Sequence, residues 1–304
     1  MRVLVTGATG WIGSAVVPEL IGAGHEVVGL ARSDASAGAL ASAGAEAVRG
    51  SLDDLDALRA AAQASDGVIH LAFKHEEAFS GDFPAATAAD RRAIETLGGA
   101  LEDSERPLVI ASGLSGQPSG TLVTEDDAPE TESVVAERML AERMVRSLAA
   151  SGVRSSSVRL APTVHGEGDP NFVAALVGLA RDRGVSGYIA DGTNTWPAVH
   201  RLDAARLFRL ALEAAPAGSV LHGVAEEGVA VRAIAEVIGR ELDLPATSIA
   251  PEEAGEHFGW LAGFVALDVR ASNRLTRERL GWPPTHPGLI DDLEQGHYFR
   301  EAAA

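Results

Sequence analysis

Short apolar runs alternate with longer segments of helical periodicity through the first two thirds of the chain. Residues 2–6 (RVLVT), 67–73 (GVIHLAF) and 107–112 (PLVIAS) are short, continuous and apolar, as buried strands are. Residues 14–24 and 89–104 instead repeat apolar positions every three or four residues, which is typical of amphipathic helices. This alternation predicts right-handed βαβ units, and therefore an α/β fold with a doubly wound parallel sheet covered on both faces.

The regular alternation loosens after Pro162. Helical segments at 170–184 and 230–243 and a proline-rich end are expected to form a smaller C-terminal lobe packed over the sheet. We assign residues 1–165 and about 186–225 to the sheet domain, and about 166–185 and 226–304 to the lobe.

Composition narrows the possible function classes. The chain has 304 residues, 46% of them hydrophobic, which is enough for one large domain with an appendage. No signal peptide precedes the first strand and no apolar run approaches the roughly 18 residues that span a bilayer, so we expect a cytoplasmic protein without a membrane partner. The chain has no cysteine, which excludes thiolate chemistry, and its net charge of −18 argues against nucleic-acid binding.

Three glycines follow the first strand directly and precede an apolar helix. In a dinucleotide-binding turn, such glycines permit a tight turn, close approach of the pyrophosphate and close packing of helix on strand. The phosphates then lie at the helix N-terminus, where free N–H groups favour anions. The spacing of Gly7, Gly10 and Gly13 is G-x-x-G-x-x-G, and its position between strand and helix favours a cofactor site over a structural turn.

The segment TGATGWIG at 6–13 resembles the nucleotide signature of the extended short-chain dehydrogenase/reductases, in their epimerase/dehydratase group. Similar segments follow in the same order over nearly the whole chain, at 50–61, 68–73, 108–113, 158–166 and 196–213. The resemblance implies a Rossmann fold in which the C-terminal lobe binds the substrate. It also implies that the apolar face of the helix containing AERMLAERMVRSLAAS pairs with its copy in a homodimer; plain packing on the sheet is the alternative.

Together, the resemblance and the residues suggest a set of cofactor contacts, with Leu52 and Asp53 beside the adenine and Pro162 to Val164 near the nicotinamide. The expected cofactor-binding residues are Thr6, Gly7, Thr9, Gly10, Trp11, Ile12, Gly13, Arg32, Ser33, Leu52, Asp53, Ala72, Phe73, Lys74, Ser112, Arg138, Pro162 and Val164.

The end of the second strand indicates which dinucleotide is bound. An NAD site places an acidic residue there, about 20 residues past the glycines, to bind the ribose hydroxyls. Here Ala31 stands at that position and is followed by Arg32 and Ser33. An arginine forms charge-assisted hydrogen bonds to a 2′-phosphate, so we expect NADP(H). The alternative is that Arg32 is an ordinary exposed arginine and Asp34 supplies the ribose contact.

The chain departs from the family in its catalytic pair. The family uses a tyrosine and a lysine four residues later, whereas Lys74 is the only lysine here and neither tyrosine precedes it at that spacing. Counting by the family's spacing places Val134 and Arg138 at the two positions, and an arginine cannot relay a proton. The serine that orients the substrate oxygen is expected at Ser112, with Ser115 as the alternative.

Two histidines are candidates for the missing proton donor. His75 follows the fourth strand at the carboxyl edge, where doubly wound sheets bind ligands, and His165 follows the sixth strand. Either could equally be structural, and Lys74 could be an ordinary surface residue. The remaining histidines are too scattered to predict a metal site.

The sequence therefore predicts an NADP(H)-dependent oxidoreductase that reduces a small carbonyl or imine-like compound without the Tyr–Lys pair. The cofactor supplies the difficult chemistry in such a reaction. Two alternatives remain open: a non-catalytic NADP-binding sensor or regulatory protein, and a nucleotide-sugar epimerase or dehydratase.

Overall fold

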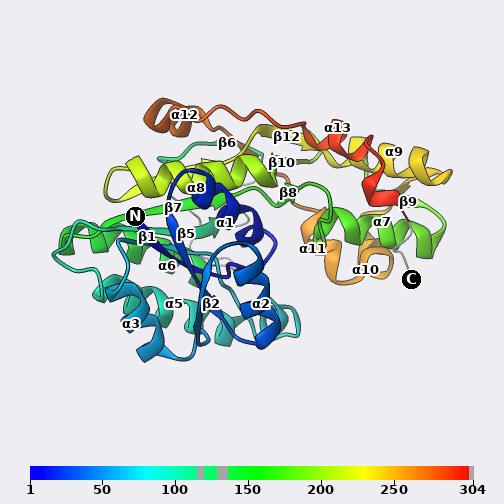
Figure 1. The fold of residues 1–304 in the computed structure, drawn as a ribbon. Coiled ribbons are helices and arrows are strands. Elements are labelled where there is room, and N and C mark those ends of the chain that lie inside the picture. Colours follow the sequence, from blue (N-terminus) through cyan, green and yellow to red (C-terminus); the bar gives the residue numbers. More distant parts are fainter. Residues whose placement is uncertain (115–119, 129–135, 301–304) are drawn as a thin grey trace.

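A seven-stranded parallel sheet forms the centre of the computed structural model, which describes residues 1–114, 120–128 and 136–300 (Figure 1). The strand order is β11-β7-β5-β4-β1-β2-β3, so the chain runs from β1 through β2 to one edge at β3, then crosses to β4 and continues to the other edge at β11. The α/β doubly wound sheet predicted from the sequence is confirmed. The seventh strand, β11, is an addition to the six expected ones. The strands are β1 (Arg2–Thr6), β2 (Glu26–Ala31), β3 (Glu46–Arg49), β4 (Gly67–His70), β5 (Pro107–Gly113), β7 (Arg154–Leu160) and β11 (Ser219–Gly223).

Helices cover both faces of this sheet (Figure 1). Alternate residues of β1 show the two layers: Val3 and Val5 pack with the core under α1, α2 and α8, whereas Leu4 packs with the core under α3, α5 and α6. The helices are α1 (Gly13–Gly22), α2 (Asp34–Ser42), α3 (Leu55–Gln63), α4 (His75–Phe79), α5 (Phe83–Gly99), α6 (Ala136–Leu148) and α8 (Arg201–Ala214). No helix in the described part of the chain is long and apolar enough to cross a membrane.

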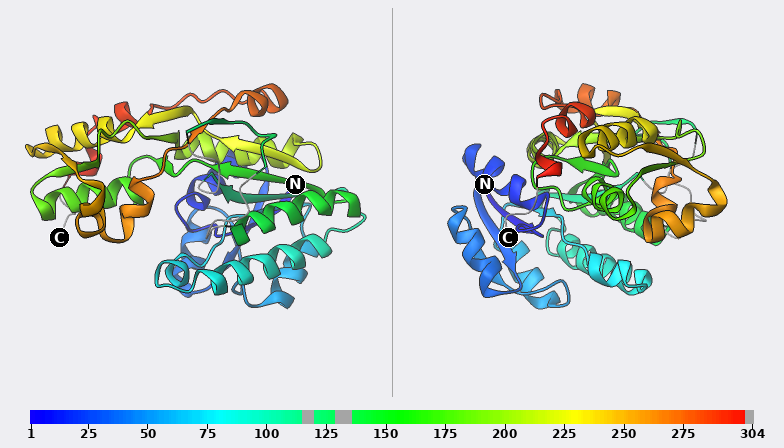
Figure 2. Two further views of the ribbon diagram at one scale, coloured as in Figure 1. Left: turned by 180° about the vertical axis from the view of Figure 1, so that it is seen from behind. Right: turned by 90° about the vertical axis from the view of Figure 1, so that its right-hand side faces the viewer.

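The C-terminal lobe has a separate apolar core and two small sheets, β8-β10-β12 and β9-β13 (Figure 2). Its elements are β8 (Thr163–His165), α7 (Phe172–Arg183), β9 (Ser186–Ile189), β10 (Thr195–His200), β12 (Glu226–Ala230), α9 (Val231–Leu242), β13 (Ala246–Ile249), α10 (Ala254–Phe258), α11 (Ala262–Val265) and α13 (Leu289–Leu293). A further strand pair, β6 (Leu122–Val123) with β14 (Arg270–Ala271), and the helix α12 (Arg274–Leu280) connect this region to the main sheet.

The structure divides residues 186–225 between the two parts. β9 pairs with β13, and Tyr188 and Trp196 pack in the core of the lobe, although we expected this stretch in the sheet domain. The following residues do join the main sheet, because β11 pairs with β7 and α8 packs against α1. The chain therefore crosses from the lobe to the sheet at His200, between β10 and α8.

Candidate cofactor and substrate site

The three glycines of the first turn have different surroundings. Gly7 has a φ of +66°, and a Cβ there would lie 2.7 Å from the backbone nitrogen of Ala72. A Cβ on Gly13 would lie 2.1 Å from the carbonyl oxygen of Gly7, so glycine is needed where α1 meets the turn. A Cβ on Gly10 would meet only that same oxygen, at 3.2 Å. Gly7 and Gly13 are thus required by the fold, while Gly10 leaves space beside the turn.

The start of α1 is suited to an anion. Its N-cap residue, Ile12, makes no side-chain capping hydrogen bond, and its first turn has no acidic residue. The first N–H groups of a helix have no partner within the helix and carry the positive end of its dipole. The residues at this turn therefore fit the pyrophosphate of a dinucleotide.

A buried chain of hydrogen bonds fixes β4 beside the turn. Thr6 Oγ1 lies 2.7 Å from His70 Nδ1, and His70 Nε2 lies 3.1 Å from Asp90 Oδ1. The backbone N–H of Ala72 donates to Thr6 Oγ1 as well. Thr6 is fully buried, so the structure gives its hydroxyl a positioning role between β1 and β4.

At the end of β2, the two candidates for the ribose end of the cofactor differ in their partners. Arg32 is exposed and makes no hydrogen bond or ion pair with any residue that the structure describes. Asp34 forms an ion pair with Arg49 at the end of β3. Ser33, which directly follows Arg32, is the N-cap of α2 and forms a reciprocal capping box with Ser36. The arginine is therefore available to an anion, whereas the carboxylate already has a cation.

Asp53, expected beside the adenine, lies in the loop after β3 and forms an ion pair with Lys74 in the loop after β4. Lys74 Nζ lies 2.9 Å from Asp53 Oδ2 and 3.1 Å from Glu77 Oε1. The hydrogen bond to Asp53 raises the pKa of Lys74, so the ammonium stays charged. Leu52 beside this pair is buried. Lys74 thus connects the loop after β3 to the loop after β4, a structural role that the sequence left open.

Ser112 lies near the carboxyl end of β5 and is 3% exposed. Its hydroxyl has no hydrogen-bond partner among the described residues. Buried hydroxyl groups in proteins are nearly always paired, so an unpaired one at this edge of the sheet is a candidate for binding a ligand. Ser115 and Val134 lie outside the described residues. Arg138 lies on α6, but the structure does not describe its side chain.

A buried ion pair ties α6 to the sheet. Arg159 on β7 is fully buried and donates to both carboxylate oxygens of Glu142 on α6, at 2.9 and 2.7 Å. His222 Nε2 lies 3.3 Å from the same guanidinium, and burial lowers the pKa of this histidine to about 4. The sequence analysis missed these residues, although a charged residue within a buried strand is itself a signal.

His165 is fully buried where the lobe meets the sheet domain. Its Nδ1 lies 2.9 Å from Asp292 Oδ2, and its Nε2 has no partner in the described part of the chain. Burial alone would raise the pKa of Asp292, but hydrogen bonds with His165 and His297 outweigh it and lower that pKa. The paired Nδ1 gives His165 a structural role, and only Nε2 is left for a ligand.

The cofactor loop and β8 are in direct contact. Trp11 Nε1 donates to the carbonyl oxygen of Val164 at 2.7 Å. The guanidinium carbon of Arg201 lies 4.1 Å from the centre of the Trp11 ring, which is a cation–π geometry. Arg201 was not anticipated. His75 starts α4 and is exposed, with its ring 5.0 Å from that of Phe73.

Neither tyrosine replaces the missing catalytic one. Tyr188 lies in β9 of the lobe, and the OH of Tyr298 donates to Asp169 Oδ2 at 2.9 Å. Burial and Asp169 raise the pKa of Tyr298, so it stays protonated. The described residues include no group of three or more histidines, aspartates and glutamates placed to hold a metal ion.

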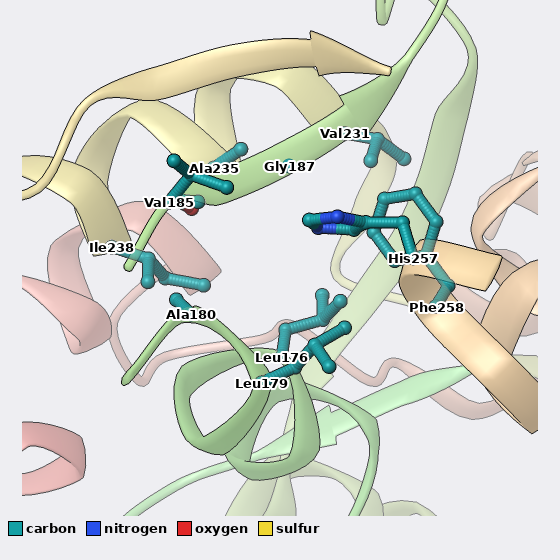
Figure 3. Close-up of a pocket in the computed structure, with 11 residues that line it drawn as sticks. Leu176, Leu179, Ala180, Val185, Gly187, Val231, Ala235, Ile238, His257 and Phe258 are labelled. Carbon is teal, nitrogen blue, oxygen red and sulfur yellow. The ribbon is translucent and has the colours of Figure 1, made fainter. Parts of the chain in front are cut away.

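The cavity in Figure 3 is separate from this site. It lies in the lobe between α7, α9 and α10, has a volume of about 10 Å³, and His257 and Phe258 point into it. That volume suits about one water molecule. His257 Nε2 is buried there without a partner among the described residues, so a water is the expected occupant.

Comparisons with known proteins agree with this geometry. The NAD dependent epimerase/dehydratase family matches residues 3–222. A protein of Schizosaccharomyces pombe, described only as uncharacterized, is 48% identical over 303 residues, covering 98% of this chain and 100% of its own. A 3-diazoavenalumate denitrifying reductase from a Streptomyces species is 29% identical over 321 residues, covering 96% and 99%. Among solved structures, UDP-glucuronic acid 4-epimerase from Bacillus cereus, in complex with UDP-glucuronic acid and NAD, has a TM-score of 0.76 at 21% identity, with 98% of both chains covered.

Proposed function

This chain belongs to the NAD dependent epimerase/dehydratase family, and from that premise we propose that it is an NADP(H)-dependent reductase of a small carbonyl or imine-like compound. The family relationship supports an enzyme that binds a nicotinamide dinucleotide. The finer assignment, to NADP(H) and to reduction, rests on residues of this chain.

The observation that carries the cofactor assignment is the contrast between Arg32 and Asp34. Asp34, the acidic residue nearest the expected ribose position, is engaged by Arg49. Arg32 is exposed and has no partner among the described side chains, so its guanidinium can bind a 2′-phosphate. Gly10 and the uncapped start of α1 would hold the pyrophosphate, and Val164 with Trp11 would lie at the nicotinamide end.

When bound, the reduced cofactor supplies a hydride to the carbonyl or imine carbon. Ser112 then orients the substrate oxygen or nitrogen through its unpaired hydroxyl, and that atom takes up a proton. His75 is the exposed candidate for the proton, and the free Nε2 of His165 is the buried one; water serves if neither does.

Calorimetric titration with NADPH and NADH tests the cofactor assignment. We expect the parent to bind NADPH more tightly and Arg32→Glu to lose most of that preference, since a carboxylate repels the 2′-phosphate. Arg277→Glu on α12 is the matched control, because Arg277 is likewise exposed and has no side-chain partner in the described structure. Equal affinities for the two cofactors in the parent would refute the assignment.

A non-catalytic NADP-binding sensor is the second candidate, and the absence of the Tyr–Lys pair specifically favours it. An epimerase or dehydratase is the third, supported by structural neighbours such as the Bacillus cereus epimerase. The sensor would bind NADPH without oxidising it, while an epimerase would convert a nucleotide sugar without net oxidation of the cofactor.

A further inference from the structure

Arg201 is a cation without a counter-charge at the junction between the lobe and the sheet domain. It is the first residue of α8, directly after the end of β10. The residue is partly buried, and its guanidinium makes no hydrogen bond or ion pair with any residue that the structure describes. Burial lowers the pKa of this guanidinium, yet an arginine keeps its charge in proteins. A charge withdrawn from water without a partner costs free energy, which an anionic ligand would recover.

The carboxylates around Arg201 are committed to other groups. Asp169, in the loop after β8, is close enough to raise the pKa of Arg201, but its Oδ2 accepts a hydrogen bond from the OH of Tyr298 at 2.9 Å. Asp203, in the first turn of α8, is fully buried. Its Oδ2 accepts from the backbone N–H of His286 at 3.0 Å, and its Oδ1 lies 2.9 Å from Nδ1 of the same residue. The structure thus leaves the guanidinium available to a ligand.

Arg201 is held against the glycine turn. Its guanidinium carbon lies 4.1 Å from the centre of the Trp11 ring, and Trp11 directly follows Gly10 in the turn. The indole extends from the turn to β8, where its Nε1 donates to the carbonyl oxygen of Val164 at 2.7 Å. The guanidinium therefore lies beside the link between the turn that would hold the pyrophosphate and the segment expected at the nicotinamide end, and the indole positions it before a ligand arrives.

The helices bring Arg201 and the start of α1 to the same edge of the sheet. Each helix leads into a parallel strand, α1 into β2 and α8 into β11, so both helices begin at the carboxyl edge. The two helices also pack against each other (Figure 1). The first turn of α1 has no acidic residue that could pair with the guanidinium in place of a ligand.

We propose that Arg201 binds the pyrophosphate of the dinucleotide, with its guanidinium donating hydrogen bonds to phosphate oxygens at the glycine turn. The planar fork of an arginine matches the geometry of a phosphate group. In a chain with a net charge of −18, a cation at this position offsets the repulsion of an anionic cofactor. Because Arg201 directly follows β10, this contact also ties the lobe to the bound cofactor. The proposal rests on the binding of a nicotinamide dinucleotide, and not on the choice between NADPH and NADH.

Calorimetric titration of Arg201→Gln with NADPH, NADH and adenosine 2′-monophosphate tests the proposal. Both dinucleotides contain the pyrophosphate, whereas adenosine 2′-monophosphate has the 2′-phosphate and no pyrophosphate. We expect the Kd for NADPH and for NADH to rise by the same factor, about 10- to 100-fold, because charged hydrogen bonds are lost. The Kd for adenosine 2′-monophosphate should not change. Arg201→Met, a second neutral variant, should behave in the same way.

Arg206→Gln is the matched control, because Arg206 is also on α8 and partly buried. It should leave all three Kd values unchanged, and an equal rise in this variant would reduce the effect of Arg201 to net charge. Urea denaturation establishes that each variant is folded.

Several results would overturn the proposal. Parental Kd values for both dinucleotides in the Arg201 variants would do so. A rise for NADPH alone would assign the guanidinium to the 2′-phosphate, and a similar rise for adenosine 2′-monophosphate would indicate a general loss of the nucleotide site. Equal affinities of the parent for NADPH and NADH would refute the NADP(H) assignment alone, since the Arg201 variants can be compared with either cofactor. A parent that binds neither dinucleotide would refute both.

Discussion

Gly10→Ala and Gly13→Ala are the same substitution in the same turn, yet we expect only Gly13→Ala to lower the free energy of unfolding substantially. At Gly13 the new Cβ would lie 2.1, 2.7 and 2.8 Å from backbone atoms of Gly7 and Ala8. Backbone atoms cannot move aside without displacing the turn or α1. At Gly10 the new Cβ would have one close neighbour, Gly7 O, at 3.2 Å. A shift of a few tenths of an ångström accommodates it.

These distances give the magnitudes. Overpacking against rigid surroundings costs about 1–3 kcal/mol, and a contact this short places Gly13→Ala near or above the upper end. Gly10→Ala should change the free energy of unfolding by less than about 1 kcal/mol, because the loss of unfolded-state entropy offsets the small crowding. Gly10→Val should fold too, but its branched side chain fills the space that the pyrophosphate needs. We expect its Kd for NADPH to rise at least about 100-fold, or about 2.7 kcal/mol.

Urea denaturation measures the stabilities, and calorimetry measures NADPH binding to the variants that fold. The reasoning is refuted if Gly10→Val binds NADPH with parental affinity, since the phosphate site would then lie elsewhere. It is refuted equally if Gly13→Ala unfolds at the same urea concentration as the parent.

Three further predictions concern buried charges and the proton. Glu142→Leu should lower the free energy of unfolding by about 3–5 kcal/mol, because it leaves Arg159 buried without its carboxylate. Adding Arg159→Met should restore most of that free energy. A loss well below this range for Glu142→Leu in urea denaturation would contradict the prediction. Burial holds the pKa of His222 at about 4 against an ordinary 6.5, so between these values the unfolded chain binds more protons and stability should fall as the pH drops. His222→Gln should flatten that decline, and a parent with constant stability from pH 7 to pH 4 would exclude the effect. If a side chain donates the proton, His75→Gln or His165→Gln should slow single-turnover NADPH oxidation about 10²–10⁴-fold, and if neither slows it tenfold, water is the donor.

The sheet and the cofactor turn were predictable because their signals are local. β1, the three glycines and α1 occupy the first 22 residues, and the atoms that surround each glycine belong to that stretch or to the residues directly after β4. The alternation of short apolar strands and helices likewise follows from burial on both sheet faces. Arg32 at the end of β2 was predictable for the same reason, because the number of residues between it and the glycine turn is enough to place it there.

Long-range pairings could not be predicted. His165 was a candidate proton donor, and its partner Asp292 lies 127 positions later in the chain. The ion pair between Asp34 and Arg49, from the next strand, is likewise not visible in the sequence around Asp34. Sequence patterns specify elements, whereas the partners of polar and aromatic side chains depend on how those elements meet.

Single-turnover oxidation of bound NADPH tests the central claim most directly. The protein is loaded with one equivalent of NADPH, mixed with a panel of neutral aromatic and aliphatic aldehydes, ketones and imines, and followed by loss of NADPH absorbance. The account predicts stoichiometric oxidation by at least one member of the panel, with formation of the reduced product. Tight NADPH binding with no oxidation by any member would contradict it and identify the chain as an NADP-binding sensor.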